Sequence, residues 1–192
     1  MPDLAGRIST ASAGTVDVIV PVYKGLEETR QCVESVLQAR CTTPFELVLI
    51  DDASPDPRLV EYCAALRDRP GVTLLVNEKN LGFVEAVNRG MRLHPDRDVV
   101  LLNSDACVAH DWLDRLARCA AREQDIGTVT PFSNNATICS YPVFCADNAV
   151  PAARLGELDA VFAQVNAGES VDLPTAVGFC MLIRRACLDQ VG

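Results

Sequence analysis

DVIVPV, at residues 17–22, is the stretch that decides the fold. The run is short, rich in β-branched residues and closed by a turn that contains proline, which favours a strand over a helix. A near-continuous apolar run of this kind is typical of a parallel strand buried on both faces. We therefore predict a central strand here, followed by a helix whose apolar positions include Leu26, Val33 and Leu37.

The alternation of strand and helix then repeats along the chain. Amphipathic helices follow the first three predicted strands, whereas residues 132–175 lose clear periodicity and predict little regular structure. After the first strand, the predicted strands are residues 45–50, 72–76, 98–103, 126–131 and 176–185. This order predicts an α/β fold, an open and mostly parallel sheet flanked by helices in the manner of a Rossmann-like nucleotide-binding half.

Composition excludes several other classes of protein. The chain has 192 residues, which fits one domain, and its formal net charge of −9 disfavours binding to nucleic acid or to anionic lipid. Its nine cysteines form no metal-ligand cluster, as expected of reduced thiols in a cytosol. No apolar run reaches the ~18 residues of a membrane span. We expect a cytoplasmic protein with at most peripheral membrane contact.

Polar residues follow three of the predicted strands at the edge where open α/β sheets bind ligands. Tyr23 either fills a partly buried site or stacks on a base. Asp51 and Asp52 either form a turn or direct one carboxylate toward the cleft. Asp105 follows the most apolar strand, with Ser104 before it. A diphosphate near these carboxylates would be repelled unless a cation lay between them, so we expect Mg²⁺ or Mn²⁺ as a cofactor.

Motifs that the chain lacks narrow the kind of nucleotide site. It contains neither the GxGxxG of dinucleotide-binding folds nor the GxxxxGK[ST] of P-loop proteins. The two histidines, His94 and His110, fit no catalytic pattern and receive no role.

Four motifs, taken in order and with their spacing, carry a resemblance to a known family. They are DVIVPVY, ELVLIDDAS, NEKNLGFVEAVNRGM and DVVLLNSDACV, and together they closely resemble family 2 glycosyltransferases with the GT-A fold. The resemblance spans residues 16–192. It implies that the protein transfers a sugar from a nucleoside-diphosphate donor, with a divalent metal and with inversion.

The resemblance also implies roles for individual residues. Pro21 and Tyr23 would contact the nucleoside, the cleft-facing Asp52 would bond the base, and Asp51 would support the loop. Asp105 would ligate the metal as the last residue of a DxD-like motif, although Asn103 stands where many members carry an acid.

Three further residues complete the predicted nucleotide site. Gly82 and Asn88 match the family's NxG…N pattern near the donor, and Ser104 is placed with the nucleotide. No catalytic residue is named, because the general base for the acceptor is expected beyond Gly192.

These expectations divide the chain into a flexible segment at residues 1–15, a donor-binding α/β domain at 16–131 and an incomplete acceptor-side region of the same domain at 132–192. The expected partners are a UDP-, dTDP- or GDP-sugar and a saccharide or lipid-linked acceptor, with no nucleic acid and with possible self-association. One alternative is a sugar-nucleotide-binding module without turnover. A third reading, a nucleotidyltransferase, has only Lys24-Gly25 in its favour.

Overall fold

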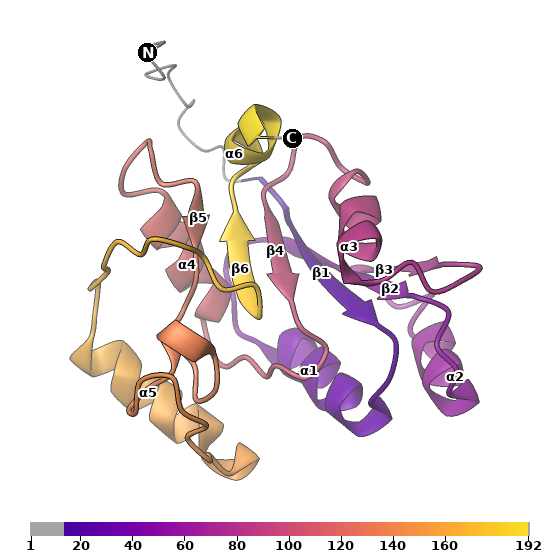
Figure 1. Cartoon of the computed structure of the whole chain (residues 1–192), viewed down its shortest axis with the longest axis horizontal. Coiled ribbons are helices and arrows are strands. Elements are labelled where there is room, and N and C mark those ends of the chain that lie inside the picture. Colours follow the sequence, from indigo (N-terminus) through magenta and orange to yellow (C-terminus); the bar gives the residue numbers. More distant parts are fainter. Residues whose placement is uncertain (1–13, 192) are drawn as a thin grey trace.

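The protein is built on one six-stranded sheet with helices on both faces (Figure 1). The computed structural model describes residues 14–191, so most of the predicted segment 1–15 lies outside the described residues. The strands are β1 (Val16–Val22), β2 (Phe45–Asp51), β3 (Val72–Val76), β4 (Val99–Leu102), β5 (Thr128–Val129) and β6 (Cys180–Ile183). The helices are α1 (Leu26–Gln38), α2 (Pro57–Ala65), α3 (Phe83–Met91), α4 (Trp112–Ala120), α5 (Leu155–Val165) and α6 (Arg185–Val191), with 3₁₀ turns η1 (Thr137–Cys139) and η2 (Ala152–Arg154).

The strands lie in the order β3-β2-β1-β4-β6-β5. The first four are mutually parallel, and β6 pairs antiparallel with both β4 and β5. The sheet is therefore mostly parallel, which confirms the predicted α/β class. Because β5 and β4 are each antiparallel to β6, they run in the same direction. The carboxyl ends of β1, β2, β4 and β5 consequently open at one edge of the sheet.

Successive residues of the central strand point into two separate cores, as the pleat of a strand requires. Val18, Val20 and Val22 of β1 pack with the helices α1, α2 and α4. Ile19, one position along, packs on the opposite face with residues of α3 and α6. Burial on both faces explains why the strand reads as an unbroken apolar run.

The helix α4 is not among the predicted helices, and it is tied to the sheet by a buried carboxylate. Asp114 is 5 % exposed and accepts hydrogen bonds from the backbone N–H groups of Thr42, at 2.8 Å, and Thr43, at 2.7 Å, as well as from both hydroxyls. Burial alone would raise the pKa of Asp114, but these hydrogen bonds outweigh it and lower the pKa from 3.8 to about 2. Asp114 therefore stays ionised and fixes the turn that leads into β2.

The region from residue 132 to 175 holds more regular structure than predicted. It contains the 11-residue helix α5 as well as η1 and η2, which corrects the expectation of little regular structure there. No residue of α5 is fully buried, although Leu155, Leu158 and Phe162 recur at helical spacing and are half-buried. Among residues 14–191, no helix has the length and apolar character needed to cross a bilayer.

Candidate functional site

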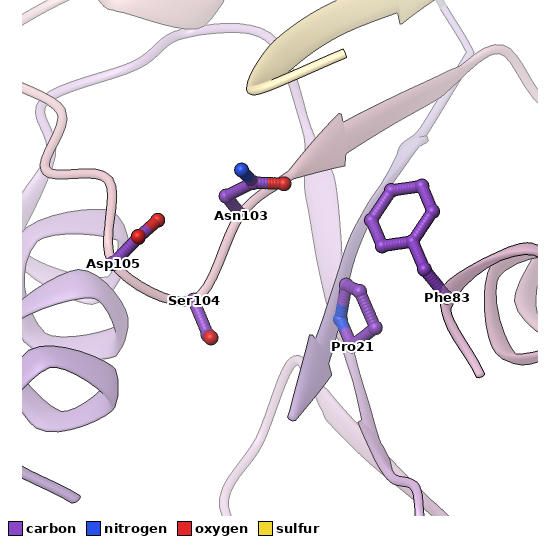
Figure 2. Close-up of a pocket in the computed structure, with 5 residues that line it drawn as sticks. All are labelled: Pro21, Phe83, Asn103, Ser104 and Asp105. Atoms are coloured by element: carbon purple, nitrogen blue, oxygen red, sulfur yellow. The ribbon is translucent and has the colours of Figure 1, made fainter. Parts of the chain in front are cut away.

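A pocket of about 230 Å³ opens where β1 and β4 end. Its lining residues are Pro21, Phe83, Asn103, Ser104 and Asp105. In Figure 2, Pro21 and Phe83 lie on one side of the pocket, and the loop after β4 lies on the other. Ligands in open α/β sheets bind beyond the carboxyl ends of strands on either side of a reversal in strand order. The strand order reverses between β1 and β4, so the pocket occupies the position that the fold favours.

The loop after β4 presents oxygen atoms to this pocket. The backbone N–H of Asn103 donates to the carbonyl of Phe179 at 2.8 Å, and the N–H of Ala106 donates to the carbonyl of Asn103 at 3.1 Å. The resulting turn leaves the side chain of Asp105 exposed. Asp105, Ser104 and Asn103 offer a carboxylate, a hydroxyl and an amide oxygen, which are the hard donors that Mg²⁺ and Mn²⁺ take. The residues present therefore fit a divalent cation.

Two thiols near Asp105 have pKa values raised above the ordinary value, so they stay protonated near neutral pH. Burial, and then the neighbouring Cys107, Asp105 and Cys180, raise the pKa of Cys32. Burial, and then Asp105, raise the pKa of Cys107. Since only a thiolate binds metal well, the carboxylate of Asp105 is the anionic donor of this group.

Asp52 holds the loop that leads into α3. It is 4 % exposed, and its Oδ1 accepts from Asn77 Nδ2 at 2.7 Å and from the N–H of Leu81 at 2.8 Å, while its Oδ2 accepts from the N–H of Gly82 at 2.8 Å. Gly82 has a φ of 79°, which favours glycine, and directly precedes Phe83 in the pocket wall. Through the backbone before Phe83, Asp52 thus positions the pocket wall that Phe83 forms.

Asp51 is also buried and bonded within the chain. Its Oδ1 accepts from the N–H of Ser54 at 2.8 Å, and its carbonyl accepts from the N–H of Asn77 at 2.8 Å. Both residues of the Asp51-Asp52 pair support loops in the structure, whereas the sequence assigned that task to Asp51 and a base contact to Asp52. The negative charge on the pocket lining itself comes from Asp105. The base contact of Asp52 stays a prediction.

Asn77 and Arg89 extend this support and are not among the predicted site residues. Asn77 is buried, and while its amide group donates to Asp52, its side-chain oxygen accepts from Arg89. Arg89 also donates to the carbonyl of Val76 at 2.7 Å. In the sequence, Asn77 directly follows a predicted strand, where an asparagine is also expected simply as part of a turn.

Tyr23 and Asn88 do not line the pocket between β1 and β4. Tyr23 lies just past the end of β1, partly exposed, with Lys24 Nζ 5.3 Å from its ring centroid. Asn88 lines a different hollow of about 240 Å³ between α3 and α6, together with Arg92 and Arg185. The structure therefore brings together Pro21, Ser104 and Asp105 of the predicted set and adds Phe83 and Asn103.

A second cluster of possible metal ligands lies at the opposite edge of the sheet, where β1 and β2 begin. Oxygen or nitrogen atoms of Asp17, Glu46 and His94 lie within 4.8 Å of one another. Arg97 Nη1 already lies between the carboxylates, 2.9 Å from Asp17 and 2.7 Å from Glu46. Burial would raise the pKa of Glu46, but hydrogen bonds from Thr73 and Arg97 lower it. The guanidinium compensates these charges, and the cluster is remote from the pocket, so we assign the candidate metal ligand to Asp105.

Comparison with known proteins identifies relatives of this chain. The chain is similar to undecaprenyl-phosphate 4-deoxy-4-formamido-L-arabinose transferase of Serratia proteamaculans, at 29 % identity over 120 residues, which cover 59 % of this chain and 36 % of that protein. The chain thus spans about a third of the length of that relative.

Solved structures share the fold. A mannosyltransferase of Pyrobaculum calidifontis in complex with GDP-Man and Mn²⁺ matches with a TM-score of 0.60 and 21 % identity, over 92 % of this chain and 46 % of that one. Residues 1–349 of Staphylococcus aureus TarS match with a TM-score of 0.63 and 18 % identity, over 92 % of this chain and 49 % of that one. The family model described as glycosyl transferase family 2 matches residues 17–192, and the chain belongs to that family.

Proposed function

We propose that this chain binds a nucleoside-diphosphate sugar in the pocket between β1 and β4 and takes part in transferring the sugar to a saccharide or lipid-linked acceptor with inversion. The observation that carries the proposal is the exposed carboxylate of Asp105 beside Ser104, at the reversal in strand order of a family 2 glycosyltransferase sheet. The comparisons do not favour the alternative of a binding module without turnover.

The residues in and around the pocket would have separate roles in binding the donor. Pro21 and Phe83 supply an apolar wall against which a nucleoside can lie, and Tyr23, just past the end of β1 and outside the pocket lining, would offer a ring for stacking. Asp105 and Ser104 would hold Mg²⁺ or Mn²⁺, which when bound neutralises the charge of the departing diphosphate. Asp52 keeps Gly82 and Phe83 in place through its hydrogen bonds, and its contact with the base is a further part of the proposal.

Single displacement also needs a carboxylate that takes the proton of the acceptor hydroxyl. The carboxylate that takes this proton is not assigned to a residue and stays a prediction. The donor contacts of Gly82 and Asn88 also stay predictions. The similar Serratia enzyme is named for an undecaprenyl-phosphate substrate, and the similar Pyrobaculum structure holds GDP-Man with Mn²⁺. These names support a sugar nucleotide as donor and keep a lipid-linked acceptor among the candidates for this chain.

The proposal sets the reaction in the cytoplasm, where thiols stay reduced. All nine cysteines fall within the described residues, and each is unpaired. The divalent cation and the cytoplasmic location of the reaction are both parts of this proposal.

Calorimetric titration of the chain with GDP, UDP and dTDP, each with and without Mn²⁺, tests the proposal. We expect one nucleotide to bind in a Mn²⁺-dependent manner and Asp105→Ala to abolish that dependence without change in thermal unfolding. Asp96→Ala removes an exposed carboxylate at the other end of the sheet and is the matched control. Unchanged Mn²⁺-dependent affinity in Asp105→Ala would remove the metal assignment. Mn²⁺-dependent hydrolysis of the matching sugar nucleotide would in addition exclude the module without turnover.

A further inference from the structure

Three aromatic rings meet on the surface next to η1 and α5. The ring centroids of Phe132 and Phe162 lie 4.8 Å apart, those of Tyr141 and Phe162 5.1 Å, and those of Phe132 and Tyr141 5.6 Å. Phe162 meets both partners nearly edge-on, at 78° and 89°. Phe132 is 45 % exposed and Tyr141 50 % exposed. We call these three residues the aromatic cluster.

The backbone fixes the two exposed rings relative to each other. The N–H of Tyr141 donates to the carbonyl of Ser133 at 2.8 Å, and the N–H of Ser133 donates to the carbonyl of Cys139 at 2.9 Å. Ser133 and Ser140 form a bridge of parallel type, so Phe132 and Tyr141 each neighbour one end of it. The rings are thereby arranged before any partner arrives, which lowers the entropy lost on binding.

The third ring is held by ion pairs on α5. Asp159 lies one turn before Phe162 and accepts from Arg115 Nη2 at 2.6 Å, while its other oxygen lies 2.7 Å from His110 Nδ1. These contacts tie α5 to the start of α4, although α5 has no fully buried residue. Phe162 therefore packs against the other two rings from a helix that these ion pairs help to hold in place.

The aromatic cluster lies at the same edge of the sheet as the donor pocket. Phe132 follows β5, which runs in the direction of β4, and η1 and α5 appear at the end of the sheet toward which the β4 arrow points (Figure 1). The segment leading into β6 connects both places, because the carbonyl of Val177 accepts from Thr130 Oγ1 at 3.4 Å and that of Phe179 accepts from Asn103 N–H at 2.8 Å.

The charge of this surface narrows the class of partner. From residue 132 to residue 153 the sequence has one charged residue, Asp147, and no lysine or arginine. An anionic lipid surface or a phosphate gains about 1 kcal/mol from each basic residue near it; this segment offers none, and Arg154, which follows it, already pairs with Glu157. Exposed amide side chains at Asn134 and Asn135 instead supply neutral donors and acceptors beside the rings. An aromatic face with neutral hydrogen-bonding groups suits the apolar face and hydroxyls of a pyranose ring.

We propose that the aromatic cluster is a binding site for a neutral saccharide, which stacks on Phe132 and Tyr141 and serves as the acceptor side of the reaction. That the saccharide is the acceptor rests on the proposed function, in which the donor pocket at the same edge of the sheet binds the other substrate. It selects the saccharide itself, rather than a lipid or a phosphate, as the chemistry that this surface recognises.

Saturation-transfer NMR on the 192-residue chain tests the site, with maltotriose, mannotriose and chitotriose as probes in the presence of Mg²⁺ and the nucleoside diphosphate that titrates best. We expect binding of at least one trisaccharide, weakened roughly ten-fold by Phe132→Ala and by Tyr141→Ala. Tyr141→Phe keeps the ring and should retain most of the affinity. Phe144→Ala, at a 67 % exposed ring outside the aromatic cluster, is the matched control.

Several results would overturn the inference. They are failure of all three trisaccharides to bind, an equal loss in Phe144→Ala, loss of binding to anionic lipid vesicles in Phe132→Ala, or dissociation of a dimer by that substitution in sedimentation. Nucleotide titration of the same samples separates the two proposals. Normal nucleotide binding without trisaccharide binding sinks this inference alone, whereas trisaccharide binding that depends on Phe132 without any nucleotide binding sinks the donor site alone.

Discussion

Replacing Asp52 by asparagine is expected to lower the free energy of unfolding, and the size of the effect reports what this carboxylate does. Asp52 is buried and takes three hydrogen bonds, from Asn77, Leu81 and Gly82. A hydrogen bond to a charged group contributes about 1.5–3 kcal/mol. The substitution keeps the shape of the side chain and removes the charge and one acceptor oxygen.

The loss can be worked out bond by bond. Asparagine retains one oxygen, which can still accept from Asn77 and Leu81, whereas its amide group faces the N–H of Gly82, donor against donor. Asn80 Oδ1 also accepts from Gly82 N–H, at 2.9 Å, and limits that loss. One charge-assisted bond disappears and two become neutral, so we expect about 2–3 kcal/mol of destabilisation. Nucleotide affinity should fall as well, because Gly82 leads into Phe83 of the pocket.

Urea unfolding, followed by the fluorescence of the single and buried Trp112 and by circular dichroism, measures this difference. Asp105→Asn is the matched control, since it makes the same chemical change at an exposed carboxylate and should alter stability by less than about 0.5 kcal/mol. If Asp52→Asn unfolds within about 0.5 kcal/mol of the parent chain while nucleotide affinity drops, Asp52 acts on the nucleotide and not on the loop, and the reasoning is wrong.

Three further changes test the scaffold around the site. Because the pKa of Asp114 is lowered to about 2, its stabilisation of about 2 kcal/mol should be complete above pH 5 and vanish as the pH falls through 2; Asp114→Asn should remove this part of the acid dependence of urea unfolding. Gly90→Val should destabilise the fold by about 3 kcal/mol, since a Cβ at Gly90 would lie 2.9 Å from Ile19 Cγ2, and an unfolding free energy equal to that of the parent chain would contradict the close packing of α3 on the sheet. Asp159→Ala should speed amide hydrogen exchange in α5 while global stability changes by less than about 1 kcal/mol, and unchanged exchange there would show that the ion pairs do not hold the helix.

The sheet could be read from the sequence because burial on both faces leaves an unbroken apolar signal. The strands predicted at residues 45–50, 72–76 and 98–103 end within one residue of β2, β3 and β4. The helix α4 shows that a readable signal can be overlooked, since Trp112, Leu113 and Leu116 recur at helical spacing on its buried face. The helix α5 has a similar spacing at Leu155, Leu158 and Phe162, but these residues are only half-buried, and ion pairs at Asp159 add to the attachment of the helix.

Residues of the site were readable where a strand end alone decides their position. Pro21, Ser104 and Asp105 follow directly from β1 and β4, and the pocket contains all three. Phe83 is not among the predicted site residues, but it is the first residue of α3 and lies in the pocket wall. Asn88 is five residues further along α3, about 7.5 Å at the rise of a helix, which carries it toward the hollow beside α6.

One carboxylate fixes the segment beside each of the two proposed sites. Asp52 holds the backbone before Phe83 with three hydrogen bonds, and Asp159 holds the helix that carries Phe162 with two ion pairs. Each carboxylate is held by partners within the chain, Asp52 by neutral amide donors and Asp159 by Arg115 and His110. In the proposed function Asp105, exposed on the pocket lining, would supply the negative charge that a divalent cation needs. The chain has a net charge of −9, and a divalent cation beside Asp105 would offset the repulsion between the acidic pocket and an anionic donor.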